Sequence, residues 1–151
     1  MENLIFPTLV SFLHSLFTVI WIGGLTTLGL VVMPTARGMK NNPQIAEFLK
    51  TVQRRLSPII WISIAGLGAT GVLLARREAA FDGLLSFTNV YSTALSVKHI
   101  LFGVMVAVAV YRSVVVIRRG VRDTRLSGAL IVLNLALGIT VLFLSAYTTV
   151  I

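Results

Sequence analysis

Four long apolar runs, separated by short polar segments, dominate the hydropathy pattern of the chain. The runs cover residues 8–33, 58–75, 92–117 and 126–150. A helix needs about 20 apolar residues to cross the hydrocarbon core of a bilayer, and each run reaches or approaches that length. The pattern therefore predicts an all-α integral membrane protein, in which residues 1–151 form a single domain built as a bundle of four transmembrane helices.

Prolines and polar residues mark the expected ends of these helices. Pro34 is expected to end the first helix, because proline cannot continue the hydrogen-bond ladder, and Pro58 is expected to open the second. Ser92 is a suitable N-cap for the third. Between the first two runs, residues 44–56 can form a short amphipathic helix at the membrane interface.

Composition and charge support a membrane protein. Hydrophobic residues make up 56% of the chain and charged residues only 12%, which is unlike a soluble domain. The net charge is +8, and the basic residues concentrate in the loops after the first and third runs. The positive-inside rule then places these loops in the cytoplasm and both termini on the extracytoplasmic side of the cell inner (plasma) membrane. Loop charges of this kind indicate anionic lipid, not nucleic acid, as the partner.

The sequence contains two histidines, and both fall inside apolar runs. His14 and His99 each lie about seven residues into a helix that starts on the outer side, so both are expected roughly 10 Å below the outer surface. An ionisable side chain at this depth is costly, and it marks a candidate functional site. We expect the two histidines to face one another across the bundle.

Helical spacing places small and aromatic residues beside these histidines. Thr18 and Gly103 each follow a histidine by four positions, which leaves room beside the imidazole for a flat, bulky group. Trp21 lies too deep for an interfacial anchor and is expected to pack under the site. Six glycines in the apolar runs would let helices approach closely: Gly23, Gly24, Gly66, Gly68, Gly71 and Gly138.

Residues 14–24 resemble the H-x6-W-x-G-G signature on the first helix of the bacterial copper resistance protein D family. Residues 70–73 and 91–98 look like the TGxL and YGxxLxxK segments of that family, with Ser92 in place of the second glycine. The resemblance covers most of the chain, although members of the family are usually longer. It implies a shared four-helix membrane core, and copper uptake or resistance as a function.

The same first-helix residues are similar to those of the small, four-helix, heme-containing protoporphyrinogen oxidase family of bacteria. Residues 53–56 match its QRRL-like stretch before the second helix, and Lys98 matches a lysine on its third helix. The chain departs from the family at residues 30–37, where a Leu-Pro-Arg-Leu-Phe motif is missing. This resemblance implies a heme and an enzyme that oxidises protoporphyrinogen.

Two histidines at one depth, in a chain without cysteine, restrict the metal chemistry. Copper or zinc usually takes three or four protein ligands, which two imidazoles do not supply. In heme the porphyrin fills four iron positions, so one histidine from each of two facing helices completes the coordination. The leading hypothesis is therefore one b-type heme held by His14 and His99, with iron-based electron transport in the membrane; copper is the alternative metal.

Other interpretations remain open for the polar residues. The histidines can instead form interhelical hydrogen bonds to Ser or Thr hydroxyls. Lys98 points about 100° away from His99 around its helix, so it either snorkels to the outer interface or pairs with a heme propionate or an acidic substrate group. Arg112 is expected to snorkel at the inner end. Asn134 either joins two helices by a hydrogen bond or contacts a quinone.

Several classes of function follow from these residues. The first is a heme electron carrier that exchanges electrons with quinone. The second is the protoporphyrinogen oxidase-like enzyme, and the third is a small subunit of a larger membrane redox complex. Copper uptake without heme is the fourth.

Overall fold

The computed structural model describes residues 4–39, 42–77, 83, 85–114 and 124–150, and it is helical throughout these elements. They are α1 (Ile5–Thr26), the π-helix η1 (Thr27–Val32), α2 (Met33–Gly38), α3 (Pro43–Ala75), α4 (Val90–Tyr111) and α5 (Thr124–Val150). Within the described ranges four helical segments are long and apolar enough to cross a membrane: Ile5–Gly38, Pro43–Ala75, Val90–Val114 and Arg125–Val150. The prediction of four long apolar helices, each able to cross a membrane, is thereby confirmed within the described residues.

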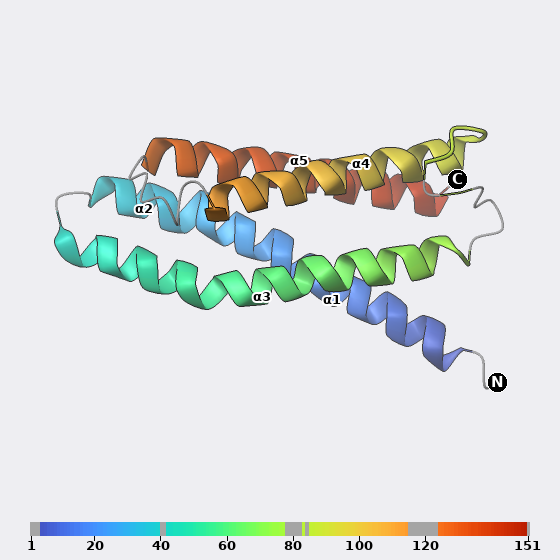
Figure 1. The fold of residues 1–151 in the computed structure, drawn as a ribbon, viewed down its shortest axis with the longest axis horizontal. Helices are drawn as coiled ribbons and strands as arrows, with labels where there is room; N and C mark the ends of the chain where they lie inside the picture. Colours follow the sequence, from blue (N-terminus) through green and yellow to red (C-terminus); the bar gives the residue numbers. More distant parts are fainter. Residues whose placement is uncertain (1–3, 40–41, 78–82, 84, 115–123, 151) are drawn as a thin grey trace.

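The helices run back and forth along one long axis (Figure 1). α1 packs chiefly against α3, and α4 against α5, while α1 also contacts α5. The amino-terminal part of α1 diverges from the other helices, and α1 begins at the same end of the bundle at which α5 ends (Figure 1). The molecule therefore consists of two helix pairs joined along α1 and α5.

The first span does not end at Pro34, so that prediction was wrong. Over η1 the hydrogen bonds lengthen to the π pattern, in which the Met33 N–H donates to the Leu28 carbonyl. The chain then resumes as α2, with Pro34 in the first turn. Proline is tolerated there because the N–H that it lacks would have no intrahelical partner.

Pro58 does not open a helix either, because α3 is continuous from Pro43 to Ala75. The separate interfacial helix predicted for residues 44–56 is therefore the first half of α3. Asn42 caps α3, and its side chain accepts a hydrogen bond of 3.0 Å from the Gln44 N–H. The helix persists through the proline because the turns that follow it bury Ile60 and Ile64 in the core.

α4 begins at Val90, two residues before the predicted start, and Asn89 is its N-cap. The Asn89 side chain accepts a 2.7 Å hydrogen bond from the Ser92 N–H. Ser92, predicted as the cap, is instead a buried residue of the first turn. The predicted end of this helix, at residue 117, lies outside the described residues.

Close helix packing depends on some of the predicted glycines and not on others. A Cβ atom at Gly66 of α3 would overlap the ring of Phe17 on α1, and one at Gly138 of α5 would overlap Ile22 on α1. By contrast, a Cβ at Gly23 or Gly24 would have nothing within 4 Å. The α1–α3 and α1–α5 contacts therefore require Gly66 and Gly138, whereas the glycine pair after Trp21 makes no close approach.

Replacing Gly66 by alanine tests this packing. Gly66→Ala is expected to lower the free energy of unfolding by about 1–3 kcal/mol, because the added methyl group displaces the Phe17 ring. Gly23→Ala, on the open side of α1, is the matched control and should not lose stability. Reversible unfolding in mixed detergent micelles measures both, and equal stability of the two variants would contradict the packing described.

Candidate functional site

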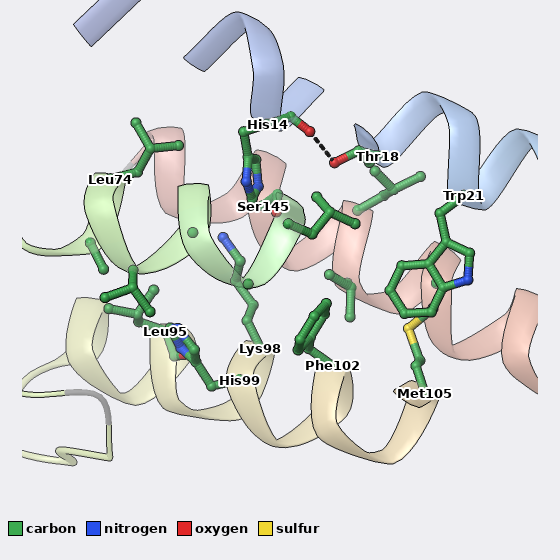
Figure 2. A pocket seen from close by; sticks show the side chains of 18 of the residues that line it. His14, Thr18, Trp21, Leu74, Leu95, Lys98, His99, Phe102, Met105 and Ser145 are labelled. Carbon is green, nitrogen blue, oxygen red and sulfur yellow. Dashed lines mark hydrogen bonds between the residues drawn. The ribbon is translucent and has the colours of Figure 1, made fainter. Parts of the chain in front are cut away.

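A cavity of about 320 Å³ lies between the α1–α3 pair and the α4–α5 pair (Figure 2). Small-molecule sites in proteins have volumes of roughly 300–1,000 Å³, so the cavity is large enough for a ligand. Its walls contain most of the residues predicted for the site: His14, Thr18, Trp21, Lys98 and His99. Gly103 does not line it; this residue is exposed on α4, and a Cβ there would have nothing within 4 Å.

The inner wall of the cavity is aromatic. Trp21 is only 2% exposed, and its ring meets that of Phe102 edge to face, with centroids 5.7 Å apart and planes at 89°. Met105 lies beside them in Figure 2. The predicted role of Trp21, packing under the histidines, agrees with this position. These side chains give the deep end of the cavity an apolar, water-excluding surface.

His14 reaches the cavity from α1, and its ring has a fixed tautomer. The Nδ1 atom lies 2.9 Å from the Thr70 hydroxyl oxygen of α3. The Thr70 hydroxyl also lies 2.6 Å from the Gly66 carbonyl, which can only accept, so the arrangement that satisfies both contacts has Nδ1 donating to Thr70. In that arrangement Nδ1 carries the hydrogen, and Nε2 of the neutral ring carries a lone pair.

His99 reaches the cavity from α4 and has the same tautomer. Its Nδ1 atom lies 2.8 Å from the Leu95 carbonyl oxygen, which can only accept. His99 Nδ1 is therefore the donor, and its Nε2 is a free acceptor. Neither Nε2 has a hydrogen-bond partner in the part of the chain that the structure describes. An imidazole anchored through one nitrogen, with a lone pair on the other, is the usual state of a metal-ligating histidine.

The His14–Thr70 contact is the interhelical hydrogen bond of the alternative interpretation. It occupies Nδ1 only, so it does not compete with ligation through Nε2. Thr18 plays no part in this bond, because its hydroxyl donates to the His14 carbonyl of its own helix at 2.8 Å (Figure 2). The hydrogen bond to Thr70 therefore orients the ring without removing its capacity to bind a metal.

Lys98 lies inside the cavity and does not snorkel to the surface. Its side chain extends from α4 toward His14 (Figure 2), close enough for the two to interact electrostatically. None of the described residues that line the cavity carries a carboxylate. A cationic group in an apolar cavity favours an anionic partner.

Sequence reasoning did not predict the role of Thr70. In the sequence Thr70 stands out only as part of the family-like motif at residues 70–73, because nothing in the helical spacing shows which hydroxyl of α3 faces α1. A buried imidazole needs a hydrogen-bond partner, and this was the one indication in the sequence that a hydroxyl must face His14. Thr70 is that partner, and its side chain is only 6% exposed.

No protein-family model, no curated protein and no solved structure matches the chain. Among the described residues no group of three or more His, Cys, Asp or Glu side chains could hold a metal ion. A site for copper or zinc made of protein ligands alone would need such a group. Within the described residues, the cavity offers His14 and His99 as its imidazole ligands.

The tautomers can be tested without any cofactor. In ligand-free protein at alkaline pH, both histidines should show ¹⁵N chemical shifts of a protonated Nδ1 and an unprotonated Nε2. Thr70→Val removes the acceptor and should change the shifts of His14 while leaving those of His99 in place. Thr18→Val is the matched control, since the Thr18 hydroxyl bonds only to backbone. A His14 ring protonated on Nε2 in the wild-type protein would contradict the assignment.

Proposed function

We propose that the cavity binds one b-type heme, with His14 and His99 as the axial ligands, and that the protein carries electrons within or at the membrane. The observation that carries this proposal is the matched state of the two imidazoles. They line one cavity from different helix pairs, each is anchored through Nδ1, and neither Nε2 has a partner among the described residues. Bundle cores commonly build cofactor sites in this way, from side chains on facing helices.

The donor set fits heme better than it fits a bare metal ion. A porphyrin brings four nitrogen ligands, so that two imidazoles complete the coordination of iron. The cavity walls also suit a porphyrin, because aromatic side chains can pack against its flat ring. Three glycines in the walls, Gly68, Gly71 and Gly138, leave space for it. Lys98 supplies a positive charge that suits a propionate.

The residues of the chain would act by positioning and by excluding water. Thr70 and the Leu95 carbonyl hold the imidazoles in the ligating tautomer and increase their basicity. Trp21 and Phe102 close the deep end against water. The heme, when bound, would supply one-electron redox chemistry. Quinone in the bilayer, or the redox subunits of a larger complex, would be the exchange partner.

The charge distribution supports an orientation for this site. The exposed basic residues Arg37, Lys50, Arg54 and Arg55 lie toward the end of the bundle formed by α2 and the start of α3. His14 and His99 lie in the first halves of α1 and α4, toward the other end (Figure 1). By the positive-inside rule, the proposed heme would sit near the extracytoplasmic face of the inner membrane, where both termini would also lie.

Histidine substitutions test the ligand assignment. His14→Ala and His99→Ala should each abolish the low-spin ferric signal in electron paramagnetic resonance and lower the heme content, because each removes one axial ligand. Gly103→Ala, one turn from His99 but outside the cavity, is the matched control and should retain both. If either histidine variant kept the wild-type low-spin spectrum, the assignment would be wrong.

Lys98 should hold a heme propionate. Lys98→Gln is expected to speed the transfer of heme to apomyoglobin by about tenfold, because a charge-assisted hydrogen bond is lost. Lys50→Gln, an exposed lysine of α3, is the control and should leave the rate unchanged. Equal transfer rates for the Lys98 variant and the wild type would exclude this role.

The position of Lys98 also favours a second candidate, the oxidation of protoporphyrinogen, because a porphyrinogen carries carboxylates that suit the same ammonium group. Complementation of a strain that lacks protoporphyrinogen oxidase distinguishes the two. Growth would establish the enzyme, whereas bound heme without complementation would favour the carrier.

A further inference from the structure

A second, small cavity of about 30 Å³ lies near the other end of the bundle, where η1, α3 and the end of α4 meet. Arg112, at the end of α4, lines it together with the polar residues Gln53, Ser57 and Ser113. Arg112 is about 20 Å from His99 along α4, at 1.5 Å per residue. The small cavity is therefore separate from the proposed heme site.

Arg112 is not the snorkelling side chain expected from the sequence. Its Nη1 atom is fully covered and has no hydrogen-bond partner in the described part of the chain. Glu47 is the one acidic residue within the described ranges; its side chain is exposed and does not line the cavity. A covered guanidinium nitrogen that lacks a counter-charge among the described residues is costly, so the position suits a bound anion.

The neighbouring groups are suited to an anion. Ser57, Ser113 and Gln53 are half-buried and line the same space, and their side chains carry hydroxyl and amide donors. A volume of 30 Å³ holds about two water-sized groups, which matches two oxygens of one phosphate but not a larger headgroup. Arginine binds two such oxygens at once through its planar fork of donors.

We propose that Arg112 binds the phosphate group of an anionic phospholipid in this cavity, with Ser57 and Ser113 as additional donors. Exposed cations at the same end of the bundle, Arg37, Lys50, Arg54 and Arg55, raise the local concentration of anionic lipid. The shared chemistry is a phosphate oxyanion, which either a lipid headgroup or free inorganic phosphate can supply. The proposal does not depend on the heme.

Native mass spectrometry of the full chain released from detergent tests the site, with phosphatidylglycerol, phosphatidylcholine and inorganic phosphate as separate probes. Wild-type protein should retain one phosphatidylglycerol in preference to phosphatidylcholine. Arg112→Gln should weaken that binding by about tenfold, since it removes charge-assisted hydrogen bonds. Arg55→Gln, an exposed arginine of α3, is the matched control and should bind as the wild type does. Displacement of the lipid by inorganic phosphate would identify free phosphate as a second source, and no displacement would identify lipid alone.

Three results would overturn the proposal. The first is equal affinity of wild type and Arg112→Gln for phosphatidylglycerol, and the second is an equal loss in Arg55→Gln, which would indicate diffuse attraction. The third is binding of phosphatidylcholine as tight as that of phosphatidylglycerol. If Arg112→Gln does not fold, the double variant Ser57→Ala/Ser113→Ala, which keeps the guanidinium, replaces it. Unchanged affinity in that variant would equally contradict the site.

Discussion

The hydrogen bond from His14 to Thr70 is the interaction on which the candidate site depends. An imidazole inside an apolar bundle is costly, and here Thr70 satisfies Nδ1 of His14 while the Gly66 carbonyl accepts the Thr70 hydroxyl hydrogen. This chain of donors leaves Nε2 as the acceptor of His14. The same result arises at His99 from a backbone carbonyl of its own helix. Two unrelated local contacts thus leave the same ring nitrogen unbonded in two histidines that line one cavity.

The sequence predicted the elements that depend on local composition. Apolar runs long enough to cross a bilayer became four candidate spans, and histidines at equal calculated depth came to line one cavity. The helix ends at Pro34 and Pro58 were mispredicted, because a π-helical segment and the packing of α3 against α1 override the local preference of proline. The partner of His14 and the direction of Lys98 depend on how separate helices face each other, which spacing along one helix does not encode.

The two cavities lie toward opposite ends of the bundle, and they are lined by different polar groups. The larger one holds two neutral ligating nitrogens and one ammonium among apolar walls, which suits a flat cofactor with acidic substituents. The smaller one holds a guanidinium with no counter-charge among the described residues, at the end of the bundle where exposed cations gather. Polar groups in a membrane helix are costly, and both cavities contain cationic or ligating groups that a bound partner would satisfy.

Near-infrared magnetic circular dichroism of the wild-type protein, purified from heme-replete cells, tests the central claim most directly, because this spectrum reports the pair of axial ligands on ferric heme. With heme content measured on the same sample, the expected result is one low-spin heme per chain with the signature of two neutral histidines. Protein that contains no heme and takes up none on addition of hemin would contradict the claim, as would a heme with any other ligand pair.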